Sequence, residues 1–149
     1  MIKSVDIYTD GACSGNPGIG GYCAILIYNG IEKIVSGCVE DTTNNRMELL
    51  SVIVGLKALK EKCEVKVYSD SQYVVDAFNL KWIDNWQKNG WKNSNKKDVK
   101  NSDLWIELLS LLNQHQVEFI KVKGHSDNEF NNRCDKIAVS EYKKLLDNN

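Results

Sequence analysis

The dipeptide Asn29-Gly30 lies between two runs of strand-forming residues, 21–28 and 31–39. Asn-Gly favours a two-residue type I′ turn, in which both central residues need a positive φ, and this turn joins antiparallel strands. We therefore expect residues 21–28 and 31–39 to pair as a β-hairpin. Residues 5–9 alternate weakly between polar and apolar side chains and predict an earlier strand. The chain should open as a three-stranded antiparallel meander.

After the meander, helical and strand patterns alternate. The polar run 42–45 offers several N-cap candidates, and apolar residues recur at helical spacing from there to residue 59. Gly55 within this helix costs about 1 kcal/mol in propensity, which suggests a close approach of helix and sheet. Later patterns predict strands over 65–69 and 117–122, helices over 71–80 and 104–112, and a terminal helix after a polar loop, 123–132. The order predicts an α/β fold, a mixed five-stranded sheet flanked by helices.

Length and composition narrow the class of protein. A chain of 149 residues fits one domain, spanning 1–149. A hydrophobic fraction of 42% and a charged fraction of 26% exclude a disordered or coiled-coil chain. Residues 1–6 lack the apolar run of a signal peptide, and no stretch approaches the roughly 20 apolar residues of a membrane span. We expect a cytoplasmic protein that does not contact membranes.

The five cysteines are widely scattered and odd in number. They are Cys13, Cys23, Cys38, Cys63 and Cys134. None forms a C-x-x-C pair, so neither a zinc site nor a disulfide framework is indicated. We expect reduced cysteines, most of them filling the core.

The net charge of −1 hides a segregation of charge along the chain. Residues 81–100 contain six lysines and two aspartates, a local balance of +4, so the rest of the chain carries −5. A basic segment on an acidic body indicates one face for a polyanion and another for a cationic ligand.

Four acidic residues lie near the ends of the expected elements. Asp10 closes the first strand and Asp70 the fourth, so parallel pairing of these strands would bring them together at the carboxyl edge, where open α/β sheets bind ligands. Glu48 lies in the first turns of an otherwise apolar helix, and Asp135 lies just inside the terminal helix. Taken singly, each acid has a structural alternative as a turn former, a helix cap or a solvated helix residue.

Six segments of the chain resemble the type 1 ribonuclease H family. They read YTDGA (8–12), GNPG (15–18), TNNRMEL (43–49), SDSQYV (69–74), KVKGH (121–125) and N-x-R-C-D (131–135). These segments run from one end of the chain to the other, so the joint match is very specific. The resemblance implies a ribonuclease H-like fold and an endoribonuclease. Such an enzyme hydrolyses the RNA strand of RNA–DNA hybrids and leaves 5′-phosphate and 3′-hydroxyl ends.

The resemblance also implies a site of four carboxylates, Asp10, Glu48, Asp70 and Asp135, which holds two divalent cations. By family analogy, Asp10 bridges both ions, Glu48 and Asp70 hold one, and Asp135 holds the other. Four carboxylates within a few Å cannot all stay ionised without a counter-cation. Oxygen-only ligands suit Mg²⁺, with Mn²⁺ as a substitute, rather than zinc. Two such ions, roughly 3.5–4 Å apart, would activate a water and stabilise the leaving 3′-oxygen.

The two histidines have different sequence contexts. His125 lies in a glycine-flanked polar loop, where the resemblance implies proton transfer or product release; the structural alternative is an ordinary surface residue. His115, between two glutamines, has no such context and is interpreted as a surface residue.

Recognition of the hybrid requires contacts to 2′-hydroxyls across a wide minor groove. The resemblance assigns these contacts to the small residues Gly11, Ala12 and Cys13, together with Asn44, Asn45, Glu48 and Gln72. Asn16 and Thr43 match positions expected to hold a phosphate of the DNA strand. Helix capping is the structural alternative for Asn44 and Asn45, and both roles are compatible.

The basic segment 81–100 corresponds to the family's basic protrusion and contains three of the four tryptophans. Trp82 is the best candidate for a contact with DNA, ahead of Trp105, because an aromatic face can pack on a sugar or base. Lysines that should bind phosphates and make affinity salt-dependent are Lys88, Lys92, Lys96 and Lys97.

The chain departs from the family pattern at two places. Asp41, Gln87 and Asn89 are not basic, as they often are in relatives, which predicts weaker substrate affinity without loss of chemistry. The acidic stretch 126–130 lacks a proline found in some relatives, so its conformation is left open.

Two other functions fit the same fold: a catalytically silent hybrid-binding module, and a nuclease with another substrate, such as a resolvase or integrase-like enzyme. All four acids are present, which argues against the first. The protrusion and Asn44-Asn45 argue against the second. We expect a monomer whose partner is an RNA–DNA hybrid.

Overall fold

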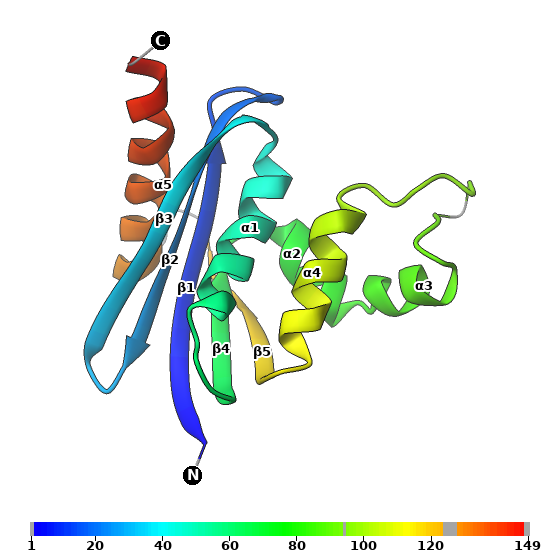
Figure 1. Ribbon diagram of the computed structural model, residues 1–149, viewed down its shortest axis with the longest axis horizontal. Helices are drawn as coiled ribbons and strands as arrows, with labels where there is room; N and C mark the ends of the chain where they lie inside the picture. The colour runs from blue at the N-terminus through cyan, green and yellow to red at the C-terminus, as the bar shows by residue number, and fades with distance from the viewer. Residues whose placement is uncertain (1, 94, 124–127, 148–149) are drawn as a thin grey trace.

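A computed structural model describes residues 2–93, 95–123 and 128–147. It contains five strands and five helices within these ranges (Figure 1). The strands are β1 (Lys3–Cys13), β2 (Gly18–Tyr28), β3 (Ile31–Thr42), β4 (Cys63–Ser69) and β5 (Gln116–Lys121). The helices are α1 (Asn44–Lys57), α2 (Gln72–Asn79), α3 (Trp82–Lys88), α4 (Ser102–Leu112) and α5 (Glu129–Asp147).

The five strands form one mixed sheet in the order β3-β2-β1-β4-β5. β1, β2 and β3 are antiparallel neighbours, whereas β4 is parallel to both β1 and β5. The predicted fold class is therefore confirmed. The hairpin turn also has the expected conformation, since Asn29 and Gly30 have φ values of 50° and 78°.

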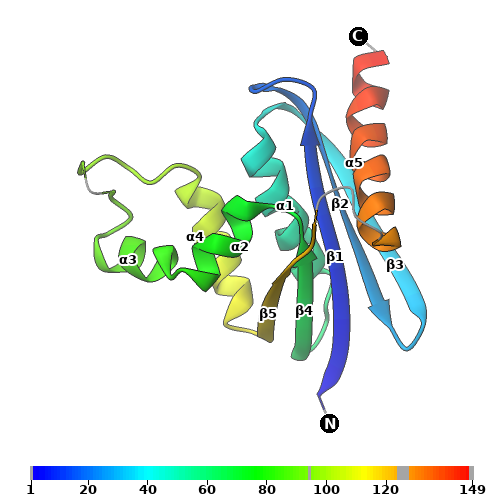
Figure 2. The ribbon, with the colours of Figure 1, turned by 180° about the vertical axis from the view of Figure 1, so that it is seen from behind.

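Helices cover both faces of this sheet. Alternate residues of a strand point to opposite faces, and Ile7, Ala24 and Val67 belong to a large core cluster with α1 and α4. Cys23 and Ile25 point the other way and pack against Cys134 and Ala138 of α5. The front and back views show α5 on one face of the sheet and α1 with α4 on the other (Figures 1 and 2). The sheet thus separates two apolar layers.

Glycine permits two close approaches between the helices and the sheet. A Cβ on Gly55 would lie 2.9 Å from Cγ2 of Ile7, so the predicted close approach of α1 to the sheet is confirmed. On the other face, a Cβ on Gly21 would lie only 2.0 Å from the carbonyl oxygen of Ala138. α5 therefore packs directly against the backbone of β2.

The meander is longer than its sequence pattern predicts. β1 continues to Cys13 and β2 begins at Gly18, so the connecting glycine-rich loop contains only residues 14–17. The pairs Gly11↔Tyr22 and Ala12↔Gly21 extend the antiparallel ladder beyond Asp10, where we expected the strand to end. Backbone pairing with β2 stabilises this longer strand, and such pairing does not require alternating polar and apolar side chains. The expectation that Asp10 closes its strand is wrong.

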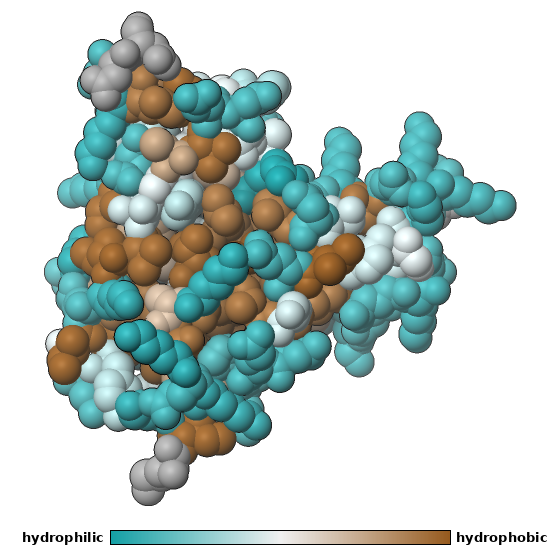
Figure 3. Space-filling model, viewed as in Figure 1, coloured by the Kyte–Doolittle hydropathy of each residue, from teal (hydrophilic) through white to brown (hydrophobic). Residues whose placement is uncertain are grey.

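Residues 81–93 and 95–100, here called the protrusion, extend away from the sheet on one side (Figure 1). The protrusion contains a short helix, α3, that the sequence pattern did not predict. Its surface is mostly hydrophilic in the space-filling view (Figure 3). Within the described ranges, no helix combines the length and apolarity that a membrane crossing needs.

Candidate active site

Asp10 and Asp70 meet where the parallel pairing of β1 and β4 ends. The register pairs Tyr8 with Tyr68, and beyond this point β1 continues with β2 alone. Asp70 directly follows Ser69, the last residue of β4. Asp10 is two residues beyond the last parallel pair, so the end of β4, not that of β1, creates the edge at which both acids lie.

Gly11 brings Glu48 to the same edge. A Cβ on Gly11 would lie 2.4 Å from the carbonyl carbon of Met47 and 2.5 Å from the backbone nitrogen of Glu48. Only a glycine fits between β1 and α1 at this point. α1 begins after Thr43, whose side chain accepts a hydrogen bond from the backbone N–H of Arg46. Glu48 therefore lies in the second turn of the helix, directly opposite β1.

Asp10, Glu48 and Asp70 each place one carboxylate oxygen within 4.8 Å of those of the other two. Asp10 is 4% exposed and Glu48 is 5% exposed. Asp10 Oδ1 accepts a hydrogen bond of 2.9 Å from the backbone N–H of Gly11. Glu48 Oε2 is buried and has no hydrogen-bond partner among the described residues. Such an unpaired buried oxygen is costly unless a ligand satisfies it.

Burial and mutual repulsion raise the pKa values of Asp10 and Glu48. The pKa of Asp10 is raised to about 7, with burial as the largest cause and the charge of Asp70 as the next. Burial also raises the pKa of Glu48 well above its ordinary value, followed by the charges of Asp10 and Asp70. Without a counter-ion, this cluster therefore holds protons near neutral pH.

The donor set fits a hard divalent cation. Its side-chain ligands are carboxylate oxygens, which Mg²⁺ and Mn²⁺ prefer, and no cysteine or histidine belongs to the group that the described residues form. A cation would supply the partner that Glu48 Oε2 lacks and would offset the repulsion among the three carboxylates. The residues present are therefore suited to such an ion.

Asp135 lines the same cavity but stands apart from the three clustered acids. Among the described residues, the group with mutual separations within 4.8 Å comprises Asp10, Glu48 and Asp70 without Asp135. Asp135 is the seventh residue of α5, deeper in the helix than we expected. Its neighbour Cys134 is fully buried, and the thiol lies 3.2 Å from the carbonyl oxygen of Tyr8 as a hydrogen-bond donor. This contact fixes α5 beside β1.

The cavity around the acids, here called the carboxylate cavity, has a volume of about 570 Å³. Besides Glu48, six residues predicted to contact the hybrid line it: Gly11, Ala12, Cys13, Asn44, Asn45 and Gln72. The remaining lining residues are the four acids with Ser71, Tyr73, Lys123, Asn131 and Asn132. Segments far apart in the sequence thus contribute to one concave, polar surface.

Five of the lining residues escaped the sequence analysis: Ser71, Tyr73, Lys123, Asn131 and Asn132. Tyr73, Lys123 and Asn131 occur inside the family-like segments, which was the available signal. Asn131 is buried, its Nδ2 lies 3.5 Å from the carbonyl oxygen of Thr9, and its Oδ1 has no partner among the described residues. Gln72 is held by Lys121, whose Nζ donates to Oε1 at 2.6 Å.

Asn16 and Thr43 lie together at the start of α1, outside the lining of the carboxylate cavity. The Oδ1 atom of Asn16 accepts a hydrogen bond of 3.2 Å from the backbone N–H of Asn44. Thr43 caps the helix, as described above. Both side chains therefore have a structural role in addition to the predicted contact with a phosphate.

The predicted DNA contacts of the protrusion also lie outside this cavity. Trp82 is 37% exposed and begins α3, whereas Trp105 is fully buried and donates its Nε1–H to the hydroxyl of Tyr73 at 2.9 Å. Because Trp105 lies in the core, Trp82 is the better candidate for a contact with DNA. Lys88, Lys92, Lys96 and Lys97 are exposed, and Lys92 forms an ion pair with Asp98.

One of the two histidines, His115, lies within the described residues. His125 lies outside the described residues, as do Ser126 and Asp127 of the acidic stretch. The interpretation of His115 as a plain surface residue is wrong. His115 is half-buried, and its Nδ1 accepts a hydrogen bond of 3.1 Å from the backbone N–H of Cys63. Burial lowers the pKa of His115.

Comparisons with known proteins identify relatives along almost the whole chain. A family model described as RNase H matches residues 2–143. Ribonuclease H of Acetivibrio thermocellus is 64% identical over 143 residues, which cover 96% of this chain and 97% of the relative. Ribonuclease H of Caldanaerobacter subterraneus is 60% identical over 145 residues, covering 97% of this chain and 95% of the relative.

Solved structures are similar in fold. LC9-RNase H1, described as a type 1 RNase H with the type 2 active-site motif, has a TM-score of 0.87 and 30% identity, covering 97% of this chain and 74% of that chain. LC11-RNase H1, solved in complex with an RNA/DNA hybrid, has a TM-score of 0.72 and 22% identity, covering 95% and 99%. Because the identity to LC11-RNase H1 is low, this similarity supports the fold alone.

Proposed function

Because the chain belongs to the RNase H family, we propose that it is an endoribonuclease that hydrolyses the RNA strand of RNA–DNA hybrids at the carboxylate cavity. The observation that carries this proposal is the convergence of Asp10, Glu48 and Asp70, with one buried oxygen of Glu48 unpaired. The expected products have 5′-phosphate and 3′-hydroxyl ends.

In this proposal, Asp10, Glu48, Asp70 and Asp135 hold two Mg²⁺ ions, for which Mn²⁺ can substitute. When bound, such ions stabilise the charge on the attacking and leaving oxygens of an in-line displacement at phosphorus. Asp10 is oriented by the N–H of Gly11, and Asp135 is carried by α5 beside β1. His125 is proposed to transfer a proton or assist product release.

Selection of RNA depends on the small residues at the end of β1. Gly11, Ala12 and Cys13 allow the backbone of the protein to approach a minor groove closely, and Asn44, Asn45 and Gln72 supply polar side chains on the same cavity. Their donors and acceptors suit 2′-hydroxyl groups, which distinguish RNA from DNA. Lys121 restrains Gln72, so its amide is oriented before substrate binds.

The DNA strand is proposed to contact Asn16 and Thr43 at the start of α1, and then the protrusion. The positive end of the helix dipole favours a phosphate at Asn16 and Thr43. Trp82 would pack against the strand, while Lys88, Lys92, Lys96 and Lys97 would bind its phosphates.

The decisive experiment compares cleavage of matched RNA–DNA, DNA–DNA and RNA–RNA duplexes, with Mg²⁺ and with Mn²⁺. We expect cleavage of the RNA strand of the hybrid alone, with 5′-phosphate ends on the products. D10N should abolish cleavage while hybrid binding persists. D6N, which removes a charge four residues earlier on β1, is the matched control and should cleave normally.

Two outcomes would favour the other functions considered above. Comparable cutting of DNA–DNA would indicate a nuclease of another specificity. Hybrid binding without cleavage by the unaltered protein would indicate a silent binding module. Unchanged cleavage by D10N would falsify the assignment of the carboxylate site.

A further inference from the structure

The terminal helix α5 continues well past Asp135, to Asp147. A groove of about 290 Å³ runs along this part of the helix and is lined by Asp135, Lys136, Val139, Ser140 and Lys143. We call it the α5 groove. Asp135 lines both the α5 groove and the carboxylate cavity. The two concave surfaces therefore share an edge at this acid.

Three polar residues of the α5 groove lie along one face of the helix. Lys136, Ser140 and Lys143 are spaced at i, i+4 and i+7, so their side chains project from the same side. The stretch from Lys136 to Lys143 spans about 10 Å along the axis. Val139 provides an apolar floor against which the lysine stems can lie. The groove thus presents two ammonium groups and a hydroxyl in a row.

The positive charges of the α5 groove are not neutralised by the described part of the protein. Elsewhere on α5, Arg133 pairs with Glu32 and Lys144 pairs with Glu141, at 2.9 Å and 2.8 Å. Lys136 and Lys143 are exposed and have no ion pair or hydrogen bond with the residues that the structure describes. Asp135 is the acid in the groove, and it belongs to the proposed cation site. These two lysines are therefore available to an external anion.

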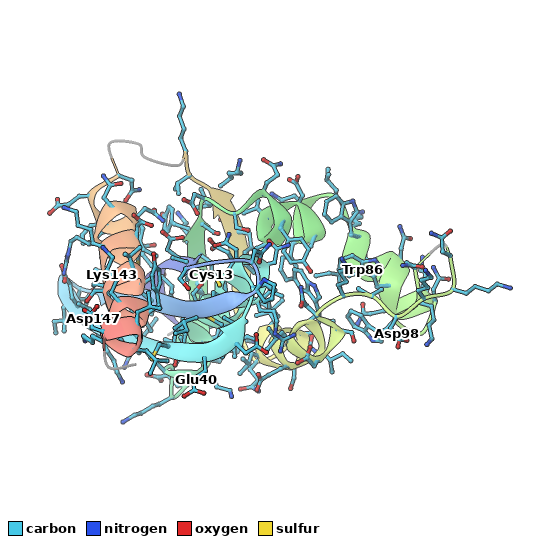
Figure 4. All side chains as sticks on the ribbon, turned by 90° about the horizontal axis from the view of Figure 1, so that it is seen from above. Cys13, Glu40, Trp86, Asp98, Lys143 and Asp147 are labelled. Carbon is cyan, nitrogen blue, oxygen red and sulfur yellow. The ribbon has the colours of Figure 1, made fainter. Side chains whose placement is uncertain are left out.

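The position of the groove indicates which anion would bind. Figure 4 shows Lys143 and Asp147 on one side of Cys13, and Trp86 and Asp98 of the protrusion on the other. Cys13 lines the carboxylate cavity, so the cavity lies between α5 and the protrusion. The DNA contacts are proposed on the protrusion side. A strand that leaves the carboxylates past Asp135 is the strand being cut, which is RNA.

We propose that Lys136, Ser140 and Lys143 bind backbone phosphates of the RNA strand next to the scissile bond. This inference rests on the proposed function and adds a second contact track, on the opposite side of the site from the protrusion. Ammonium and hydroxyl groups donate to phosphate oxygens without reading base identity.

The test compares the K136Q/K143Q variant with a control that removes the same charge elsewhere. Lys60 and Lys62 are exposed and precede Cys63, which pairs with Lys3 at the end of β1 farthest from Asp10. K60Q/K62Q therefore controls for general electrostatic steering. K136R/K143R retains both charges and should retain binding. The fold of each variant is checked by circular dichroism and thermal melting.

We expect K136Q/K143Q to raise KM for the hybrid about three- to tenfold. It should also reduce the slope of log affinity against log salt by about 0.9 for each phosphate that is no longer bound. K60Q/K62Q should change the slope far less. Hybrid binding is also measured by fluorescence anisotropy in the D10N background, where no cleavage occurs. An effect of K136Q/K143Q no larger than that of K60Q/K62Q would overturn the inference.

Neutral methylphosphonate linkages identify the strand. When these linkages replace RNA phosphates next to the scissile bond, the unaltered protein and K136Q/K143Q should bind the hybrid with equal affinity. When they replace DNA phosphates, the difference in affinity between the two proteins should remain. The reverse pattern would refute the assignment to RNA. If the unaltered protein binds hybrid without cutting it, and K136Q/K143Q still binds hybrid more weakly, the proposed function is wrong but the proposed phosphate contacts of α5 are supported. If the unaltered protein cuts hybrid and K136Q/K143Q binds hybrid with the same affinity, only the proposed phosphate contacts of α5 are wrong.

Discussion

Gly11 of β1 and Glu48 of α1 lie so close that a Cβ on the glycine would be 2.5 Å from the backbone nitrogen of Glu48. The obstacle is the backbone of a helix, which cannot rotate away as a side chain could. The missing side chain of Gly11 is therefore what allows Glu48 to reach Asp10 and Asp70. The N–H of Gly11 also holds Asp10.

The first prediction concerns this contact. G11A should displace the start of α1 and separate Glu48 from Asp10, lowering kcat/KM by about 100-fold or more, because displacements near 1 Å can have such effects. G30A is the control. Gly30 has φ +78° with open space around it, so its replacement should cost about 1 kcal/mol of stability through backbone strain. Cleavage assays and thermal melts separate the two effects; normal activity of folded G11A would contradict the prediction.

The second prediction concerns pH and the metal-free protein. The pKa of Asp10 is raised from 3.8 to about 7 in the folded state, so the folded protein retains a proton that the unfolded chain releases. Its contribution to the free energy of unfolding is present below pH 3.8 and is lost as pH rises through about 7. Urea denaturation in a chelator should show this loss. The D10N variant should lose less stability over the same range of pH.

A third prediction follows for added Mg²⁺. Protons and the cation compete for the same carboxylates, so Mg²⁺ should raise the melting temperature more at pH 8 than at pH 5.5. The difference should be small in D10N. Equal stabilisation of the unaltered protein at both values of pH would show that the cation does not bind at these carboxyl groups.

The fourth prediction concerns His115, whose pKa is lowered by burial. Protonation would convert Nδ1 from the acceptor of the Cys63 N–H into a donor. The contribution of His115 to stability is therefore present above its ordinary pKa of 6.5 and is lost as pH falls below it.

H115N tests this assignment, because an amide oxygen can accept the same hydrogen bond without titrating. The free energy of unfolding of the unaltered protein should fall relative to that of H115N between pH 6.5 and 5. Parallel pH profiles for the two proteins would contradict the prediction. Since the acids of the carboxylate cavity affect both proteins alike, the difference isolates the histidine.

The fifth prediction concerns the ion pair that fixes α5. Arg133 donates to both carboxylate oxygens of Glu32 on β3, at 3.0 Å and 2.9 Å, and its guanidinium lies over the ring of Phe130. Asp135 follows two residues later. E32Q should lower stability only slightly, since solvent screens an exposed ion pair. It should also raise the Mg²⁺ concentration needed for half-maximal activity, because α5 is less firmly placed.

A charge swap tests whether the pair itself matters. E32R/R133E should recover the Mg²⁺ dependence that E32Q loses. K144Q, which breaks the Lys144–Glu141 pair on the same helix, should leave it unaltered. Failure of the swap to restore the Mg²⁺ dependence, with the fold intact, would argue against a positioning role.

Local chemistry in the sequence determined the hairpin, the cap of α1 and the segments that carry the acids. Asn29-Gly30 specifies its own turn because the required positive φ is a property of these two residues. The close approach at Gly55 was also predictable, since a glycine in a helix interior needs a packing reason. These features depend on a few neighbouring residues.

Tertiary structure decided where the site is and how its groups ionise. Asp10 lies inside β1 because pairing with β2 extends that strand to Cys13, and it lies at an edge of the sheet because β4 ends earlier. Neither length can be predicted from the residue pattern of β1 alone. The burial of Glu48, the core position of Trp105 and the separation of Asp135 from the other acids likewise arise from packing. Desolvation and repulsion depend on distances between segments far apart in the chain, which only the folded structure sets.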